Sequence, residues 1–194
     1  MNIWFGKITL LVGIALAAAI RAPHGKRRSK IRRIETRKGK LEIALLSLAW
    51  LGSVILPALW VLTPFLSFAD YPLYPGSFGA GTVFFSLGLW MFYRSHADLS
   101  TNWSLSLDIL ENHTLITTGL YKDIRHPMYT AIVLQGIGQA LIASNWVVGP
   151  LNLCAFMLLF FLRLRPEERM MLQHFGADYE AYMRKTKRII PGIW

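Results

Sequence analysis

The chain has 194 residues, of which 54% are hydrophobic and only 16% are charged, and its mean hydropathy is +0.38. Soluble domains carry about 25% charged residues, so this composition excludes an ordinary water-soluble enzyme and predicts a protein embedded in lipid. The net charge of +10 does not indicate nucleic-acid binding, because ten of the 21 Lys and Arg lie within residues 21–40. Basic loops beside apolar segments are typical of membrane topology, and we expect no nucleic-acid partner.

Apolar segments of span length, or slightly shorter, follow one another along the chain. They are Ile3–Ile20, Leu41–Leu66, Phe78–Phe92, Tyr129–Ala143 and Trp146–Leu162. The first is interpreted as a membrane span and not as a secretory signal peptide, because the basic cluster follows it instead of preceding it. The last two are joined only by Ser-Asn, which predicts a short antiparallel helical hairpin crossing most or all of the bilayer.

The distribution of cations predicts an orientation. Lys and Arg occur in residues 21–40, in residues 94–128 and after Leu162, whereas residues 67–77 contain none. Because positively charged loops stay in the cytoplasm, five crossings with an outer N-terminus and an inner C-terminus satisfy every loop. The predicted fold is therefore an all-α integral membrane protein of about five transmembrane helices, with a cytoplasmic amphipathic tail helix. Residues 1–194 form one membrane domain, with three spans and the basic loop before residue 101.

Two polar segments interrupt this apolar chain. One is GLYKDIRHPMYTA, residues 119–131, at the start of the hairpin, and the other begins at Arg163, at its end. Because the hairpin returns to the membrane surface it left, the two segments should face each other there. Arg163 and Glu167 are four residues apart and share a helical face, although Pro166 should kink that helix. Ionisable groups at membrane depth are costly unless they are paired or line a cavity, so a polar cytoplasmic cavity is predicted.

Individual residues in these segments and elsewhere in the chain add three expectations. Pro127 suits the first turn of a helix, where its missing N–H is not needed. Apolar and aromatic side chains at Met171, Phe175, Tyr179 and Tyr182 predict an amphipathic surface helix with a possible break at Gly176. The five His are scattered and the single Cys lies in an apolar run, so no metal site is expected.

The segments NHTLITTGLYKDIRHPMYTA and RLRPEERMMLQHFGADYEAYMRKTKRIIP together resemble the isoprenylcysteine carboxyl methyltransferase family. The resemblance covers roughly residues 113–191. It implies a short, prokaryotic member of a superfamily that includes phospholipid methyltransferases and, more distantly, membrane sterol reductases. It also implies an enzyme that uses S-adenosylmethionine as its cofactor and an inward loop after residue 100 that helps to bind it.

The resemblance also assigns roles to individual residues. It implies a cofactor pocket built from His113, Thr114, Leu115, Ile116, Tyr121, His126, Pro127, Met128, Tyr129 and Glu167. Glu167 would hold the ammonium group or a ribose hydroxyl of the cofactor, and Arg163 would hold the carboxylate of a prenylcysteine substrate. These two residues, Arg163 and Glu167, are the implied catalytic pair.

The expected reaction is transfer of a methyl group to the carboxylate of a lipophilic, prenylcysteine-like small molecule or protein C-terminus. That carboxylate is ionised near pH 7, so no general base is needed and the protein has to align the reactants and exclude water. Three alternatives stay open. They are an N-methyltransferase for a phospholipid or other lipid amine, which would need a proton acceptor such as Glu167, a nicotinamide-dependent membrane reductase, and a non-enzymatic lipid-binding protein.

Overall fold

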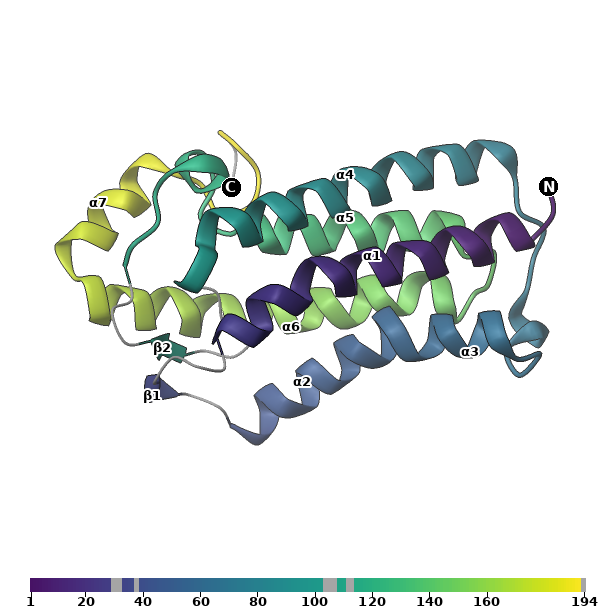
Figure 1. Cartoon of the computed structure of the whole chain (residues 1–194), viewed down its shortest axis with the longest axis horizontal. Helices are drawn as coiled ribbons and strands as arrows, with labels where there is room; N and C mark the ends of the chain where they lie inside the picture. Colours follow the sequence, from purple (N-terminus) through teal and green to yellow (C-terminus); the bar gives the residue numbers. More distant parts are fainter. Residues whose placement is uncertain (29–32, 37–38, 103–107, 111–113, 193–194) are drawn as a thin grey trace.

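The computed structural model describes residues 1–28, 33–36, 39–102, 108–110 and 114–192. Within them the chain forms an elongated bundle of long helices (Figure 1). These are α1 (Trp4–Arg28), α2 (Lys40–Trp50) continued by a π-helical turn η1 (Leu51–Ile55) and by α3 (Leu56–Leu62), α4 (Pro75–Leu99), α5 (Pro127–Ile142) and α6 (Val148–Phe175). The shorter helical elements are the 3-10 turns η2 (Ser67–Ala69), η3 (Ser100–Asn102) and η4 (Gly119–Lys122), and the tail helix α7 (Ala177–Lys185).

The apolar helices confirm the predicted membrane-protein fold, but not the number of crossings. By length and hydropathy, Trp4–Gly25, Lys40–Leu62 and Val148–Phe175 are candidate spans, and α5 is a shorter apolar helix. At about 1.5 Å per residue, the 25 residues of α4 measure about 37 Å, which exceeds the roughly 30 Å of the hydrocarbon layer. However, α4 is not apolar enough to be a candidate among the residues described. Five crossings therefore stay a prediction.

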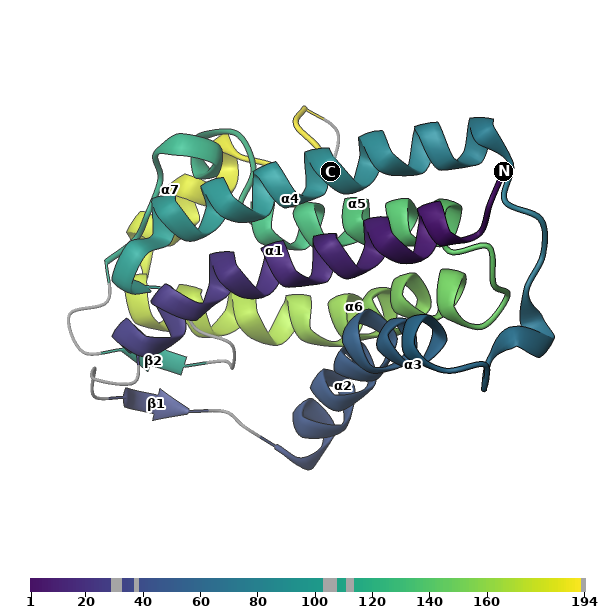
Figure 2. The same cartoon turned by 45° about the vertical axis from the view of Figure 1, so that its right-hand side comes forward.

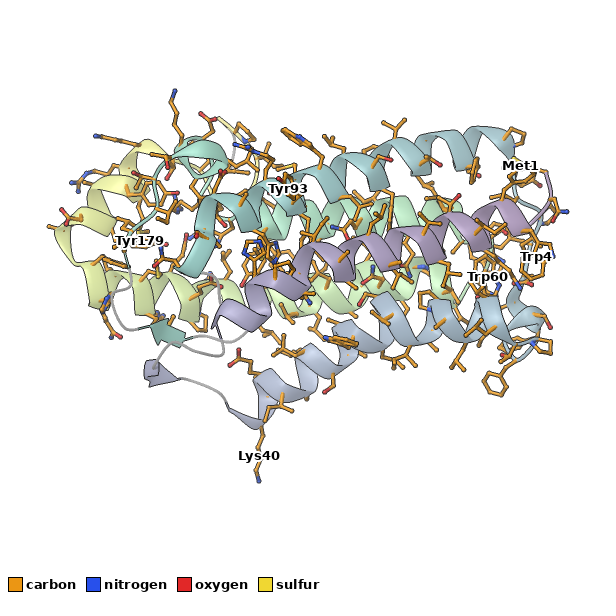
Figure 3. The ribbon with its side chains drawn as sticks, viewed as in Figure 1. Met1, Trp4, Lys40, Trp60, Tyr93 and Tyr179 are labelled. Atoms are coloured by element: carbon orange, nitrogen blue, oxygen red, sulfur yellow. The ribbon has the colours of Figure 1, made fainter. Side chains whose placement is uncertain are left out.

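The two ends of the bundle differ as the cation distribution predicts. Figure 1 shows the N-terminus at the same end as the α3–α4 and α5–α6 connections. The opposite end carries α7 and the ends of α1 and α4 that lead into the basic loops. Figure 3 shows Met1, Trp4 and Trp60 at the first end and Tyr179 at the second. The segments predicted to face one side thus lie together.

A small two-stranded sheet joins the two loops at this end, an element that the sequence analysis does not contain. β1 (Arg33–Thr36) pairs with β2 (Asp108–Leu110) in antiparallel fashion, with Thr36 opposite Asp108. Figure 2 shows the pair beside the end of α1 and below α6. Each strand is very short, so neither gives the alternating pattern by which strands are recognised in a sequence.

The second span is continuous through Pro57, and the π-helical turn explains how. Proline has no N–H and its ring collides with the carbonyl four residues earlier, so a proline disrupts a regular helix. Here Leu56 N–H donates to Leu51 O, a bond over five residues, immediately before Pro57. The carbonyl of Gly52 is left without either usual helical donor, because Leu56 is engaged elsewhere and residue 57 is proline. The helix then ends at Leu62, before Pro64.

The antiparallel α5–α6 hairpin is confirmed, and α6 is longer than predicted. It continues past Leu162 to Phe175 without interruption at Pro166 and ends where Gly176 takes a φ of +54°. The break expected at Gly176 is confirmed, because this residue divides the amphipathic segment predicted around Met171 to Tyr182 between α6 and α7. Tyr179 and Tyr182 are buried, 2% and 7% exposed, so these two side chains pack within the protein.

Helices α4 and α5 approach closely because glycines of each helix lie against the backbone of the other. A methyl group at Gly88 would meet the carbonyl oxygen of Ala131 at 2.8 Å, and one at Gly138 would meet the backbone nitrogen of Phe85 at 2.6 Å. Small residues at helix contacts are typical of membrane bundles, where close backbone packing replaces the hydrophobic effect. This contact fixes the position of α5, whose first turn carries much of the candidate site.

Candidate functional site

A cavity of about 540 Å³ runs inside the bundle towards the end that carries α7. This volume is within the range of small-molecule sites in proteins. Small and apolar side chains of α1 and α2 form one wall, including Ala17, Ala18 and Ala49, and Phe156 and Leu159 of α6 form another. The mouth is polar and is lined by α5, α6, α7 and the residues around η4. The cavity therefore combines a lipid-like interior with a charged opening.

The described residues predicted from the family resemblance lie at this mouth, with one exception. Those that line the cavity are Thr114, Leu115, Ile116, Tyr121, His126, Met128, Tyr129, Arg163 and Glu167. Pro127 does not line it; it begins α5 and is buried, as expected for the first helical position. His113 lies outside the described residues. The structure thus brings segments 114–129 and 163–167 together, and the roles given to these residues stay predictions.

Glu167 is the centre of the polar group at the mouth. The hydroxyl of Tyr129 donates a hydrogen bond to Glu167 Oε2, and Arg163 Nε lies 3.6 Å from the same oxygen. His126 Nδ1 is 3.9 Å from Glu167 Oε1, and the His126 ring stacks on Tyr129 with centroids 5.3 Å apart. The Glu167 side chain is 26% exposed and lines the cavity, whereas those of Arg163 and His126 are only 10% and 7% exposed.

Arg163 has a second carboxylate beside it that the sequence analysis missed. Glu42 of α2 approaches Arg163 Nη1 to 3.7 Å, and both side chains are only 10% exposed. These two distances from Arg163, 3.6 and 3.7 Å, are longer than an N–H···O hydrogen bond, so they are ion pairs without close donor contact. The sequence contains one sign of this contact: Glu42 is a single carboxylate at the start of an apolar segment. An ionised group in such a position needs a partner of opposite charge.

A second ionic cluster, centred on Glu168, stands behind the mouth. Arg125 donates two hydrogen bonds to Glu168 Oε1, of 3.1 and 3.0 Å, and Arg188 donates to Oε2 at 2.9 Å. His126 Nε2 is 3.6 Å from Glu168 Oε1. Two guanidinium groups that bind one carboxylate form a hydrogen-bonded network, which is more stable than an isolated ion pair. Glu168 does not line the cavity, and we interpret it as a residue that holds the surrounding segments in place.

The C-terminal residues are tied to the mouth through their backbone. Arg125 N–H donates to Lys187 O at 2.7 Å, and His126 N–H donates to Arg188 O at 2.9 Å. Thr130 adds a bond from its hydroxyl to Ile189 O at 2.8 Å. Residues 187–189 therefore lie along the segment that enters α5 and hold His126 in position.

The tail helix packs its tyrosines over the η4 turn. Tyr182 donates its hydroxyl hydrogen to Tyr121 O at 2.6 Å, and both residues line the cavity. Burial raises the pKa of Tyr121 well above its ordinary value of 10, and the negative charge of Glu167 acts in the same direction. Burial likewise raises the pKa of Tyr182. Both phenols are therefore neutral at physiological pH, so each hydroxyl keeps its proton and can donate a hydrogen bond, as that of Tyr182 does.

The loop entering η4 is fixed by short polar contacts. Gly119 has a φ of +61°, and a Cβ there would collide with the carboxylate of Asp98. The same carboxylate accepts a hydrogen bond from Leu120 N–H at 2.9 Å. Thr114 N–H donates to Asn102 Oδ1 at 3.0 Å, which joins this loop to η3, the turn that follows α4. These contacts place residues 114–116 against the cavity.

Residues 80–173 match the model of the isoprenylcysteine carboxyl methyltransferase (ICMT) family. The predicted family resemblance is confirmed over this region. It includes α5, most of α4 and nearly all of α6, and so most of the described residues that line the mouth. The family match does not extend to α1, α2 or the tail helix.

Named relatives match over similar lengths. A protein-S-isoprenylcysteine O-methyltransferase of Schizosaccharomyces pombe is 30% identical over 111 residues, which is 55% of this chain and 47% of the relative. A probable protein-S-isoprenylcysteine O-methyltransferase of rice, Oryza sativa subsp. indica, is 34% identical over 87 residues, 43% of this chain and 44% of the relative. The enzyme of that name from Saccharomyces cerevisiae is 35% identical over 86 residues, 42% of this chain and 34% of the relative. The matches thus span half or less of each relative's length.

A solved structure shares the fold over nearly the whole chain. The eukaryotic intramembrane Ras methyltransferase, isoprenylcysteine carboxyl methyltransferase, superposes with a TM-score of 0.59 over 98% of this chain and 67% of that chain, at 21% identity. At this identity the likeness shows the fold alone. It extends to α1 and α2, which lie outside the region that matches the family model.

Proposed function

We propose that this protein is a membrane methyltransferase that transfers a methyl group from S-adenosylmethionine to the carboxylate of a prenylcysteine-like substrate. The observation that carries the proposal is the cavity itself. One continuous space joins a mouth containing Arg163 and Glu167 to an interior lined by Phe156 and Leu159. Such a space suits a molecule with an ionised head and a hydrocarbon tail, and the names of the relatives agree with it.

The polar mouth fits the cofactor. Glu167 and the phenol of Tyr129 offer an acceptor and a donor for the amino and hydroxyl groups of the cofactor. Residues 114–116 line the same cavity and add backbone N–H and C=O groups. His126 Nε2 is a buried polar atom without a hydrogen-bond partner among the described residues. When bound, S-adenosylmethionine supplies an electrophilic methyl group on a sulfonium. The residues present would hold such a group by hydrogen bonds and one carboxylate, without a metal.

Arg163 would hold the substrate carboxylate. Its guanidinium can offer two parallel N–H donors to a carboxylate, an arrangement that Lys cannot match. The ion pairs with Glu42 and Glu167 keep its charge in place before substrate arrives. Because the attacking carboxylate is ionised near pH 7, no residue has to remove a proton. The buried walls exclude water, which strengthens the attraction between carboxylate and sulfonium.

The hydrocarbon tail would enter from the bilayer between α1 and α2. The facing walls carry small side chains at Ala17, Ala18 and Ala49, which leave room for a chain between the helices. The mouth would face the cytoplasm, since the loops and tail that carry most of the Lys and Arg lie at that end. A prenylated small molecule or protein C-terminus would then present its carboxylate from the cytoplasmic surface.

Two measurements on detergent-purified protein test the proposal. Calorimetry should show binding of S-adenosylhomocysteine and none of NADPH, and labelled S-adenosylmethionine should transfer its methyl group to N-acetyl-S-farnesylcysteine. Arg163→Lys keeps the charge but loses the paired donors, so turnover should fall at least about tenfold while S-adenosylhomocysteine binding is retained. Binding of NADPH alone would replace the proposal with a reductase, and methylation of phosphatidylethanolamine alone would replace it with a lipid-amine methyltransferase.

A further inference from the structure

One charged side chain on the cavity wall has no part in the function proposed above. Arg21 of α1 lines the cavity, one helical turn beyond Ala17 on the same face of the helix. It lies within the candidate span Trp4–Gly25, near the end that carries α7. An arginine at the end of a span can extend to lipid head groups, but this one faces the cavity. Ionisable groups in such places commonly bind a charged ligand or partner.

Arg21 reaches the cavity at the depth of the polar mouth. Its guanidinium lies over the ring of Phe92 of α4, with Cζ 5.3 Å from the ring centroid. Gly88 of α4 lies against Ala131 of α5, and Figure 1 shows that these two helices run in opposite directions. Phe92 is one turn beyond Gly88, so it is level with the first turn of α5, which contains Tyr129.

The arginines on the cavity wall can be compared with the anions of the proposed reaction. Among the residues that the structure describes, these arginines are Arg21, Arg125 and Arg163. Arg125 donates to Glu168 and to the carbonyl oxygen of Thr186, so it belongs to the ionic cluster behind the mouth. Arg163 is assigned to the acceptor. The reaction, however, brings two carboxylates into the cavity, because the methionine part of S-adenosylmethionine carries one of its own. Arg21 is the arginine to which the second carboxylate can be assigned.

The position of Arg21 also favours the cofactor over the acceptor. Helix α1 packs against α4 and η3, and Asn102 of η3 holds Thr114 through two hydrogen bonds, of 3.0 and 3.1 Å. Residues 114–116 are those proposed to lie beside the cofactor. Arg163 belongs instead to α6, and its ion pairs are with Glu42 of α2 and Glu167 of α6. The two arginines therefore reach the cavity from different helices.

A stack of rings supports the guanidinium of Arg21. His96, which is fully buried, contacts Phe92 in an edge-on arrangement with ring centroids 4.3 Å apart, and His24 of α1 packs against His96 at 5.1 Å. A guanidinium donates its hydrogen bonds in its own plane, so stacking fixes its orientation without using its donors. A group that is held in place in this way loses less freedom when a ligand binds.

We propose that Arg21 binds the carboxylate of the methionine part of S-adenosylmethionine through charge-assisted hydrogen bonds. This inference rests on the proposed function and adds a cofactor-binding residue from α1, a helix outside the region that matches the family model. With one carboxylate at Arg21 and the other at Arg163, the methyl donor does not occupy the place of the methyl acceptor.

The test compares two ligands by calorimetry, S-adenosylhomocysteine and its decarboxylated analogue, which keeps the amino group. The parent protein should bind the decarboxylated analogue at least about tenfold more weakly, since a lost hydrogen bond between charged groups has an effect of that order. Arg21→Gln keeps a polar side chain without the charge. In this variant the two ligands should bind equally, to within about twofold, because the group that distinguishes them is absent.

Arg165→Gln is the matched control, because Arg165 is exposed and does not line the cavity, although its loss changes the net charge equally. This variant should distinguish the two ligands as the parent does. Steady-state kinetics give a second measurement. Arg21→Gln should raise KM for S-adenosylmethionine at least about tenfold and leave KM for N-acetyl-S-farnesylcysteine within about twofold of the parent value.

Equal affinity of the parent for the two ligands overturns the role of Arg21, and so does full discrimination in Arg21→Gln. If Arg21→Gln does not unfold cooperatively, Arg21→Lys decides. It keeps the charge but loses the planar stack on Phe92 and the paired donors, so the discrimination should shrink at least about threefold, and undiminished discrimination overturns the inference. A parent protein that does not bind S-adenosylhomocysteine overturns the proposed function instead.

Discussion

The ion pair between Glu42 and Arg163 allows a quantitative prediction, because it is buried and joins α2 to α6. At 3.7 Å and an effective dielectric constant of about 20, the attraction between two unit charges is about 4 kcal/mol. Part of this offsets the cost of taking both charges out of water. Glu42→Gln removes one carboxylate, but Glu167 still faces the guanidinium. We therefore expect a loss of about 2 kcal/mol, below the 3–5 kcal/mol of a buried charge left wholly unpaired.

The assay is thermal unfolding in detergent, where about 2 kcal/mol corresponds to a fall in Tm of about 4–8 °C for a chain of this size. The control is Glu180→Gln, whose pair with Arg184 is shorter, 2.9 Å, but has both side chains more than 60% exposed. An exposed helix pair contributes about 0.3–0.5 kcal/mol, so this variant should shift Tm by less than about 2 °C. Comparing the two variants shows whether the burial of an ion pair or the distance between its charges determines its contribution to stability.

The double variant Glu42→Gln with Arg163→Gln decides whether the charges act on each other. In the double variant no buried arginine lacks a carboxylate partner, so most of the stability lost in Glu42→Gln should be recovered. On the function proposed above, the double variant should not catalyse methyl transfer. Strictly additive effects of the two single changes, or an unchanged Tm in Glu42→Gln, would show that the pair is not coupled and would refute this reasoning.

Three further predictions concern the mouth and the tail. Tyr129→Phe removes the hydrogen bond to Glu167, and calorimetry should show S-adenosylhomocysteine binding weakened about tenfold, a value typical of a lost bond to a charged group; equal affinity would contradict the role given to this tyrosine. Glu168→Gln weakens the bonds to Arg188, so limited proteolysis should cut the C-terminal residues faster than in the parent, whereas an unchanged cutting rate would mean that the backbone bonds suffice. Because burial raises the folded-state pKa of Tyr121, its contribution to stability is complete below pH 10 and is lost as the pH rises further, so unfolding midpoints should fall above pH 10, and less so in Tyr121→Phe.

The sequence predicts the helical hairpin and the meeting of its two polar ends, because both follow from local patterns. Apolar segments joined by two residues have to fold back, which puts Tyr129 and the region of Arg163 at one end. The bond from Tyr129 to Glu167 confirms that these segments meet. The family resemblance adds residues 114–116, whose sequence alone gives no reason to place them at a site.

Contacts between distant segments could not be predicted in this way. Glu42 precedes Arg163 by more than 120 residues, and the sequence around neither residue indicates a contact with the other. The bond from Gln139 to Gly52 depends on a π-helical turn, whose extra residue shifts every following side chain and has no reliable pattern. The amphipathic pattern around Gly176 fits one helix as well as two, and only the positive φ of Gly176 distinguishes them.

The hydrogen bonds of residues 187–189 to the start of α5 also have a consequence for biosynthesis. The helices of the bundle can enter the membrane one after another as they are made, but Arg125 and His126 receive their backbone partners only when Lys187 and Arg188 have left the ribosome. Chains that lack residues 187–189 would already occupy the membrane and would still lack a complete mouth. On the function proposed above, such chains would bind the methyl donor poorly and would not transfer its methyl group.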